Sequence, residues 1–521
     1  MTPLAVAAVQ KQRLRSLASP LSVVALSGGL GLLAVLLHWH GQDFPAQLFR
    51  ADIVHRYGYI IWNSQWYGGH ALLSYSVLTP IVGSAVGLSA LSVVTAVASA
   101  VLFERILYLA LGRHAPLVAL WFALATAVNL INGRVTFGFG AALGLAALYL
   151  LLKKHTVWAV VASILCPLAS PLAGAFLALA LVIWFGAKSD RRPAIALVAA
   201  GALAPILVLY VLFPASGPEP YGRGSLIFDL ALCLLLVWGG WDWPLLRYGA
   251  LLYGVCAIGS YYIPSLVGSN VSRLGEYLAV PLLILVLFPK RRVLLFLLAV
   301  PLFVWQCYPA FDAVAYARSD PSTSPAFYTP LLSYLHAQPG LLGRVEIPMT
   351  YRHWESAYAG TSIMLARGWE RQLDIAYNPI FYNQPLTSLS YHTWLTTNGV
   401  EYVALPHAAL DSSSFTEQRL LESPVPYLKP VWSSANWTVW RVTDYSGLVQ
   451  GQATLSAVSP DRLVLEVTAP GTLKLRFRSS PRWDTNHNGC ADATPAGWLV
   501  LENVHPGPLI LKQSLRGSPC G

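Results

Sequence analysis

Long apolar runs alternate with short polar breaks through the first 309 residues of the 521-residue chain. Most of these runs approach the length of about 20 residues that an α-helix needs to cross a membrane. The pattern predicts a polytopic helical domain at residues 1–309 with about eleven spans. The spans are expected at residues 20–39, 76–102, 115–131, 137–152, 156–170, 171–187, 193–213, 225–240, 246–264, 274–289 and 292–309. The short pair 156–170 and 171–187 carries Pro167 and Pro171, and a re-entrant hairpin is the alternative interpretation.

The pattern changes after Pro309. Between residues 310 and 424, helix-like stretches such as FYTPLLSYLHAQ alternate with short strand-like stretches such as VEYVALP, which predicts an α/β domain. From residue 425 to 521, apolar and polar positions alternate with a period of two between turn residues, which predicts a β-sandwich. The expected fold class is an α-helical polytopic membrane protein followed by an α/β plus β-sandwich region.

Composition agrees with a membrane protein. Hydrophobic residues make up 55% of the chain and charged residues 11%, whereas about 25% is usual in a soluble protein. The net charge of +10 is uneven, because residues 1–308 hold 19 Lys and Arg but only 8 Asp and Glu. A basic excess confined to the membrane domain is a topology signal, so no nucleic-acid partner is expected.

The predicted loops fall into two sets by charge. One set holds all the lysines of this domain and is expected to face the cytoplasm. Its basic residues are Lys11, Arg13, Arg15, Arg105, Arg113, Lys153, Lys154, Lys188, Arg191, Arg192, Arg247, Lys290, Arg291 and Arg292. The other set holds only arginines, namely Arg50, Arg56, Arg134, Arg223 and Arg273. The sorting predicts a multi-pass plasma-membrane protein with a cytoplasmic N-terminus and residues 310–521 outside.

The first outer loop, residues 41–80, is the longest polar break in the membrane domain. A helix from Pro45 to about Ile61 would be two-faced, with an apolar side expected to lie in the membrane interface. Asp43 precedes this helix. It either caps the helix or acts as a general base for an acceptor hydroxyl. Asp52, beside His55, is the rival base.

Arginines on the outer side run against the orientation rule and suggest a bound phosphate, because the guanidinium fork pairs well with it. The alternative is that they are ordinary loop residues. Glu276, near Arg273, lies inside an apolar run and is a candidate site residue, or else a structural ion pair. Trp66 can stack on a sugar, although aromatic residues are common at membrane interfaces. The candidate substrate-binding residues are Arg50, His55, Arg56, Arg134, Arg273, Glu276, Trp66 and His70, of which His70 is also readily explained as structural.

Two features concern the C-terminal region. Cys490 and Cys520 are its only cysteines, and an oxidising compartment would join them in a disulfide. The run DTNHNGCAD partly matches a calcium loop, with ligands expected at Asp484, Asn486, Asn488 and Asp492. Proline stands at the twelfth position of that loop, and a strand-connecting turn explains the run equally well.

The stretches GQDFPAQLFR, IIWNSQWYGGH, GSNVSRLGE and RGWERQLDIAYNPIFY, with the span pattern of residues 1–309, resemble the GT-C superfamily of membrane glycosyltransferases. The similarity is to a subgroup of large bacterial membrane proteins typical of actinobacteria. The resemblance implies inverting transfer of a sugar from a polyprenyl-phosphate donor to a cell-envelope glycan, lipid or protein, with Asp43 at the position of the base. The superfamily's paired acidic signature is absent, because Gln42 precedes Asp43. Because this acidic pair is missing, the resemblance leaves open whether a divalent cation takes part.

Two other functions fit the same sequence. An envelope-lipid transporter or flippase would be expected to have repeated halves and charges midway through its spans, and neither is evident. A non-catalytic scaffold that binds glycan through its β domain is the third alternative. The leading hypothesis places Asp43, Arg50, Asp52, Arg134, Arg273 and Glu276 in one polar cavity at the outer ends of the spans.

Overall fold

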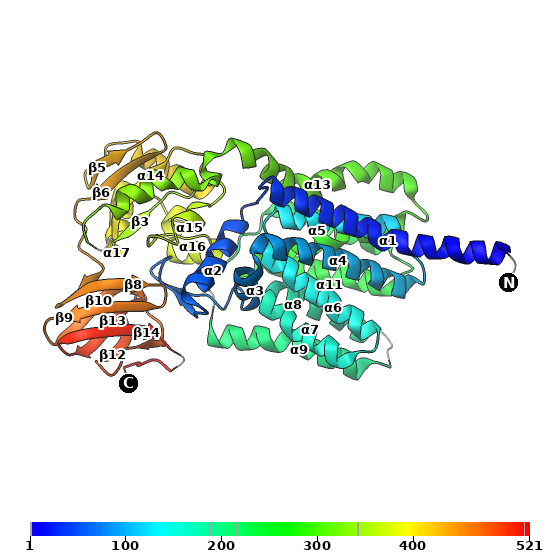
Figure 1. Ribbon diagram of the computed structural model, residues 1–521, viewed down its shortest axis with the longest axis horizontal. Helices are drawn as coiled ribbons and strands as arrows, with labels where there is room; N and C mark the ends of the chain where they lie inside the picture. The colour runs from blue at the N-terminus through cyan, green and yellow to red at the C-terminus, as the bar shows by residue number, and fades with distance from the viewer. Residues whose placement is uncertain (1–2, 187–189, 215, 341–342, 515, 521) are drawn as a thin grey trace. The chain divides into compact units, whose positions relative to one another are not determined.

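The computed structural model describes residues 3–186, 190–214, 216–340, 343–514 and 516–520, with side chains from Pro20 onward. The predicted inner-loop residues Lys11, Arg13, Arg15 and Lys188 lie outside the described side chains. The chain divides into two compact units (Figure 1). The first unit comprises residues 1–47 and 74–317, and the second comprises residues 48–73 and 318–521.

The first unit is helical. Its helices are α1 (Pro3–Leu36), α3 (Leu78–Val86), α4 (Leu88–Leu111), α5 (Pro116–Ile131), α6 (Val135–Leu152), α7 (Thr156–Ala169), α8 (Pro171–Gly186), α9 (Arg192–Leu212), α10 (Arg223–Gly239), α11 (Pro244–Tyr262), α12 (Ser272–Leu287) and α13 (Arg292–Ser319). A short 3-10 turn, η1 (Gly268–Val271), precedes α12. The predicted span 76–102 is divided at Gly87, whose φ of 85° suits glycine and ends α3.

Five segments among the described residues are long and apolar enough to cross a membrane. They are α4, α6, α9, the stretch Gly268–Leu287 that contains α12, and α13. Four shorter apolar helices accompany them. The N-terminal region is therefore helical with five candidate spans, and the count of eleven stays a prediction.

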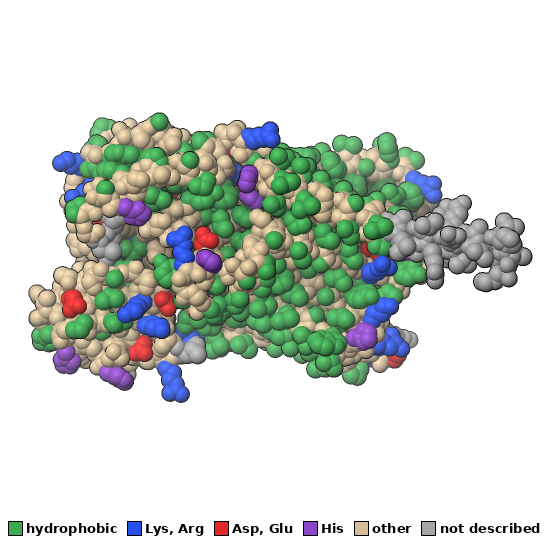
Figure 2. Space-filling view, viewed as in Figure 1, with side chains coloured by type: hydrophobic (Ala, Val, Ile, Leu, Met, Phe, Trp, Pro, Cys, Tyr) green, Lys and Arg blue, Asp and Glu red, His purple; other side chains and the backbone are tan. Residues whose placement is uncertain are grey.

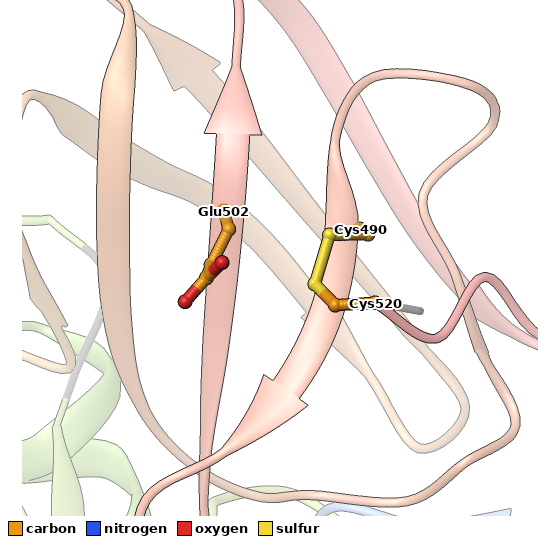
Figure 3. A group of neighbouring side chains, drawn as sticks. All are labelled: Cys490, Glu502 and Cys520. Carbon is orange, nitrogen blue, oxygen red and sulfur yellow. A yellow bond between two sulfur atoms is a disulfide. The ribbon is translucent and has the colours of Figure 1, made fainter.

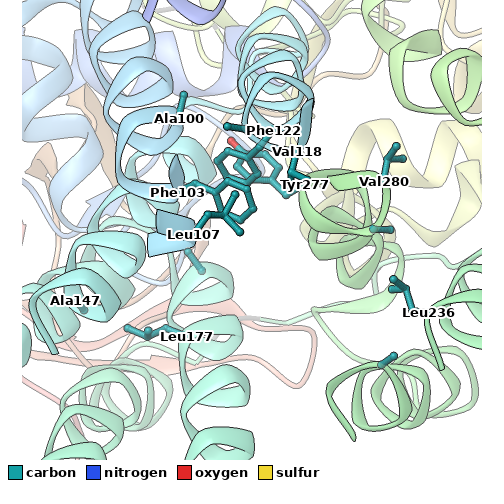
Figure 4. Close-up of a cluster of buried hydrophobic side chains, with 14 of the residues drawn as sticks. Ala100, Phe103, Leu107, Val118, Phe122, Ala147, Leu177, Leu236, Tyr277 and Val280 are labelled. Atoms are coloured by element: carbon teal, nitrogen blue, oxygen red, sulfur yellow. The ribbon is translucent and has the colours of Figure 1, made fainter. Parts of the chain in front are cut away.

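Side chains on these helices separate into a packed interior and an apolar exterior. The rings of Phe103 and Phe122 stack with centroids 3.9 Å apart, and Tyr277 meets Phe122 edge-on (Figure 4). Apolar side chains of α9 and α13, such as Val211 and Phe296, are largely exposed. Figure 2 shows hydrophobic side chains covering the visible face of this helical unit. An apolar exterior of this kind suits a lipid environment.

The second unit contains a mixed sheet in the order β3-β4-β6-β5. Its strands are β3 (Arg344–Glu346), β4 (Val400–Pro406), β5 (Leu428–Ser433) and β6 (Trp437–Val442). Only the β3–β4 pair is parallel. The longer helices of this part of the unit are α14 (Pro325–His336), α16 (Arg371–Tyr377), α17 (Ser388–Thr397) and α18 (Phe415–Leu421).

Residues 449–513 form two four-stranded sheets with a shared apolar core. One sheet has the order β12 (Cys490–Ala493), β13 (Trp498–Val504), β10 (Gly471–Arg478), β7 (Val449–Gln450). The other has the order β11 (Trp483–Asp484), β14 (Gly507–Gln513), β9 (Arg462–Val467), β8 (Ala453–Ser459). Alternating side chains such as Leu463 and Leu465 face the core, as a period of two requires.

The strands that follow the domain boundary predicted at residue 425 do not all lie in the β-sandwich. β5 and β6, expected in the β-sandwich, belong to the mixed sheet, because β6 pairs antiparallel with β4. Every residue of β4 is buried, so this central strand needs hydrogen-bonded neighbours on both edges, and β6 supplies one of them.

Residues 48–73 belong to the second unit, although they lie in the first predicted outer loop. They include most of α2 (Phe44–Tyr57) and the short pair β1 (Trp62–Asn63) and β2 (His70–Ala71). The sequence predicts that the apolar face of α2 lies in the membrane interface. In the structure, Phe49 and Ile53 of that face are instead fully buried in the protein. Phe49 stacks on Trp66 with ring centroids 3.9 Å apart. Aromatic side chains of the protein, and not lipid, therefore cover this apolar surface and remove it from water.

Candidate functional site

Four of the predicted site residues form one chain of alternating charges in the helical unit. Arg273 donates a hydrogen bond from Nη2 to Oδ2 of Asp43 at 3.0 Å. Arg134 lies on the same oxygen, with Nε 3.6 Å from it. The other end of the Arg134 guanidinium donates to Glu276. The order is therefore Arg273, Asp43, Arg134, Glu276, with equal numbers of positive and negative charges.

Close backbone packing places Asp43 beside Arg134. The Gly41 N–H donates to the Ile131 carbonyl at 2.7 Å, and a side chain at Gly41 would meet the backbone of Asn132 at 2.5 Å. Gln47 completes the junction. Its Nε2 donates to the Gly133 carbonyl at 2.5 Å, and its Oε1 accepts from the Thr136 N–H at 2.7 Å. The turn between α5 and α6 therefore holds the residues on both sides of Asp43.

Arg273 and Glu276 lie in the first turn and a half of α12. They are three residues apart, so both reach the same side of the helix. The backbone carbonyl of Glu276 accepts from Gln306 Nε2 at 2.7 Å, and Gln306 Oε1 accepts from the Trp121 indole at 2.5 Å. A polar link from α5 through α13 thus supports this end of α12.

The four charged side chains are partly accessible, unlike most buried ion pairs. Exposed fractions are 18% for Arg134, 20% for Arg273, 27% for Asp43 and 26% for Glu276. Two guanidinium groups that share one carboxylate oxygen can instead share an oxygen of a phosphate, which is a strong charge-assisted acceptor. The geometry therefore suits an anion that competes with Asp43 for Arg134 and Arg273.

Asp229 is a residue that the sequence analysis missed. It lies in α10 and is almost fully buried. Its Oδ2 accepts two hydrogen bonds at 2.5 Å, one from the Tyr221 hydroxyl and one from the Ser272 hydroxyl. Ser272 immediately precedes Arg273, so this carboxylate anchors the start of the helix that carries two site residues. An aspartate within the apolar run 226–238 was the available signal, because an intramembrane carboxylate suggests function by default.

Other candidates belong to the second unit. Arg50 has an exposed fraction of 2%, lies over the Trp66 ring and pairs with Glu370, which is 320 residues away in the chain. Its guanidinium already has a carboxylate partner. Removing either partner would leave a buried charge without its counter-ion.

Asp52 is half-buried, and burial raises the pKa of its carboxyl group while Arg56 and His55 oppose the rise. His55 is exposed, and Arg56 donates to the Thr361 carbonyl at 3.5 Å. His70 is buried against the ring of Trp66. Burial, with the nearby charge of Arg50, lowers the pKa of His70 to about 3, so it is neutral and not a proton carrier at pH 7. The single cavity predicted for Asp43, Arg50, Asp52, Arg134, Arg273 and Glu276 stays a prediction.

The mixed-sheet part of the second unit contains a buried charge cluster that the sequence analysis also missed. Arg367 makes hydrogen bonds to both carboxylate oxygens of Asp374, at distances down to 2.6 Å. Glu346 and Glu417 lie 3.8 Å and 3.6 Å from another nitrogen of Arg367. Burial and mutual repulsion raise the pKa of Glu346 well above its usual value, and burial raises that of Glu417. The cluster therefore favours retaining a proton on this acid pair.

Cys490 and Cys520 form a disulfide bond, in the pairing that the sequence predicted (Figure 3). Glu502 lies beside them, and this is the one group in the described part of the chain in which three possible metal-ligand atoms lie within 4.8 Å of one another. Sulfur atoms joined to each other are not thiolates, and the thiolate is the form that binds metal. This cluster is thus explained by the disulfide.

The predicted calcium residues make local hydrogen bonds. Asp484 accepts from the Asn486 N–H at 2.9 Å and from the Ser518 hydroxyl at 3.0 Å. The side-chain carbonyl of Asn488 accepts from the His505 N–H at 2.7 Å, and Asp492 accepts from the Ala493 N–H at 2.7 Å. These bonds stabilise turns, and calcium binding stays a prediction.

No family model matches this chain, and no curated protein matches it. The resemblance to the GT-C superfamily therefore stays a prediction from the residues quoted for it.

Proposed function

We propose that the chain is a membrane glycosyltransferase that transfers a sugar from a polyprenyl-phosphate donor to a cell-envelope acceptor, with inversion at the anomeric carbon. The observation that supports this most directly is the convergence of Arg134 and Arg273 on one oxygen of Asp43. A phosphate needs such guanidinium donors, and a hydroxyl nucleophile needs a carboxylate base. Both requirements are met within one cluster.

The proposed protein has about eleven spans, a cytoplasmic N-terminus and an extracytoplasmic C-terminal region. Apolar helices and the charge sorting of the loops support this topology. The cluster then lies at the outer membrane face, where the lipid tail of a donor can remain among the helices while its phosphate reaches Arg134 and Arg273.

The proposed transfer is a displacement at the anomeric carbon of the donor sugar. An oxygen of the donor phosphate accepts hydrogen bonds from Arg134 and Arg273, in place of the Asp43 carboxylate. Asp43 is then free to face the acceptor. The acceptor oxygen forms a bond to the sugar's anomeric carbon, and the bond from that carbon to the phosphate oxygen breaks. The phosphate leaves with the electron pair, and Asp43 takes the hydroxyl proton. Fixed positive charge at the leaving phosphate stabilises the transition state.

The test is Asp43→Asn, which keeps the shape of the side chain but removes the base. Transfer from a radiolabelled polyprenyl-phosphate sugar should fall by about 10²-fold or more. Asp242→Asn is the matched control, because Asp242 is an exposed carboxylate paired with Lys290 and outside the cluster. If Asp43→Asn transferred sugar at the wild-type rate and Asp52→Asn did not, Asp52 would be the base. An active protein indifferent to both changes would exclude the proposed mechanism.

A further inference from the structure

A second polar feature of the helical unit lies where α12 is followed by α13. The turn carries the consecutive basic residues Lys290, Arg291 and Arg292, and both flanking segments are candidate membrane spans. Lys290 pairs with Asp242 at 2.7 Å. Arg291 lies 3.5 Å above the ring of Trp238, and Arg292 lies over Phe288. In the described part of the chain, neither arginine makes an ion pair with a carboxylate, so a net positive charge remains at this turn.

Two grooves meet beside this turn. One, of about 580 Å³, is lined by residues 289–294 and Leu297, including all three basic side chains. The other, of about 600 Å³, is apolar and is lined by Ala231, Leu234, Leu235 and Trp238 of α10 with Leu294 of α13. Leu294 lines both grooves, so the groove beside the basic turn and the apolar groove along α10 share this side chain.

Exposed aromatic residues mark the same end of the helices. Trp238, Trp241 and Trp243 are 49%, 65% and 42% exposed, and Arg247 lies over the ring of Trp241. Tryptophan and arginine together are typical of the level of lipid headgroups. A ligand that fits both grooves there has a negatively charged headgroup and a hydrocarbon chain.

We propose that the α12–α13 turn and the groove along α10 and α13 bind an anionic phospholipid of the leaflet at that membrane face. The phosphate lies on Arg291 and Arg292, neither of which makes an ion pair within the described part of the chain, with Lys290 beside it. One acyl chain lies past Leu294 against Leu234 and Trp238. A zwitterionic phospholipid has the same chains but adds a positive charge to this basic turn, so it binds more weakly.

The test uses the purified full-length protein in a nonionic detergent with equal amounts of dioleoyl-phosphatidylglycerol and dioleoyl-phosphatidylcholine. Native mass spectrometry counts the bound lipids. The wild-type protein should retain phosphatidylglycerol in preference to phosphatidylcholine. The double variant Arg291→Gln/Arg292→Gln should bind it about 30-fold more weakly, which equals about 2 kcal/mol at about 1 kcal/mol per basic residue. Arg292→Gln alone, at an exposed position, should lose about 5-fold.

The matched control is Lys153→Gln/Lys154→Gln, which removes the same charge from the exposed turn between α6 and α7. It should keep wild-type affinity. Equal loss in this control would show that only overall charge attracts the lipid, and equal binding of the two lipids by the wild type would also overturn the proposal. Leu294→Trp fills the junction of the grooves without changing charge, so it should weaken binding too. Unchanged affinity in that variant would exclude a chain held past Leu294.

Discussion

Arg273 donates a 3.0 Å hydrogen bond to Asp43 across 230 residues of chain. The two residues come from the first predicted outer loop and from the start of α12, and Arg134 approaches the same carboxylate oxygen. This relationship turns separate loop charges into one cluster.

Arg273→Lys keeps the positive charge but removes the planar fork that can hold two oxygens at once. Donor binding should weaken by about 10-fold or more, in line with loss of one charge-assisted hydrogen bond of about 1.5–3 kcal/mol. The KM for a polyprenyl-phosphate sugar measures this, while the melting temperature should change little. Arg223→Lys is the matched control at another predicted outer arginine, and an equal rise in KM there would remove any special role of Arg273.

Asp229→Ala should loosen the start of α12, because the hydroxyls of Tyr221 and Ser272 lose a buried acceptor. Both residues are half-buried, so each hydroxyl that loses this acceptor should cost about 1 kcal/mol, the lower end of the range for an unsatisfied group. Hydrogen–deuterium exchange of amides 268–276 should become faster, and the KM for donor should rise as Arg273 loses its position. Asp229→Asn keeps an acceptor oxygen and should restore much of both properties. Unchanged exchange in the alanine variant would contradict the positioning role.

Replacing both Cys490 and Cys520 by serine opens a closed loop with a sequence separation of 30 residues. The unfolding free energy of the second unit should fall by about 3–4 kcal/mol in the chain-entropy model. Thermal unfolding of the full chain, with and without reductant, measures the change. Reductant should lower the wild-type transition and leave the double variant unaffected. The prediction would be contradicted if the wild-type unfolding temperature did not change after the reductant had fully reduced both cysteines.

The buried acid pair Glu346 and Glu417 predicts a pH dependence. Their pKa values in the folded protein lie above the usual 4.5, so the folded state retains protons that the unfolded state releases. The stability contribution of these protons is complete below about pH 4.5 and is lost as pH rises through the folded values. Glu417→Gln can still accept from the Tyr391 hydroxyl, and it should flatten the fall of melting temperature between about pH 5 and pH 8. An unchanged slope would show that another group causes it.

Sequence reasoning located the helical region and the strand-rich region because both follow from local periodicity. Apolar runs near membrane length and alternating strands are visible without any knowledge of distant contacts. The disulfide pairing also followed, since Cys490 and Cys520 are the two cysteines of the C-terminal region. The candidate cluster was reached in part: Asp43, Arg134, Arg273 and Glu276 were named from their loops, and the structure brings them together.

Tertiary structure alone decided which partners these residues take. Arg50 was grouped with the outer arginines, but it pairs with Glu370, 320 residues away. β5 and β6 have the alternation of sandwich strands, but they pair with the mixed sheet because β4 is buried and needs a neighbour. The carboxylate of Asp229 is satisfied by Tyr221 and Ser272 from two other segments. Periodicity encodes which face of an element is buried, whereas hydrogen bonds and ion pairs depend on which elements meet, and that is set by packing of the whole chain.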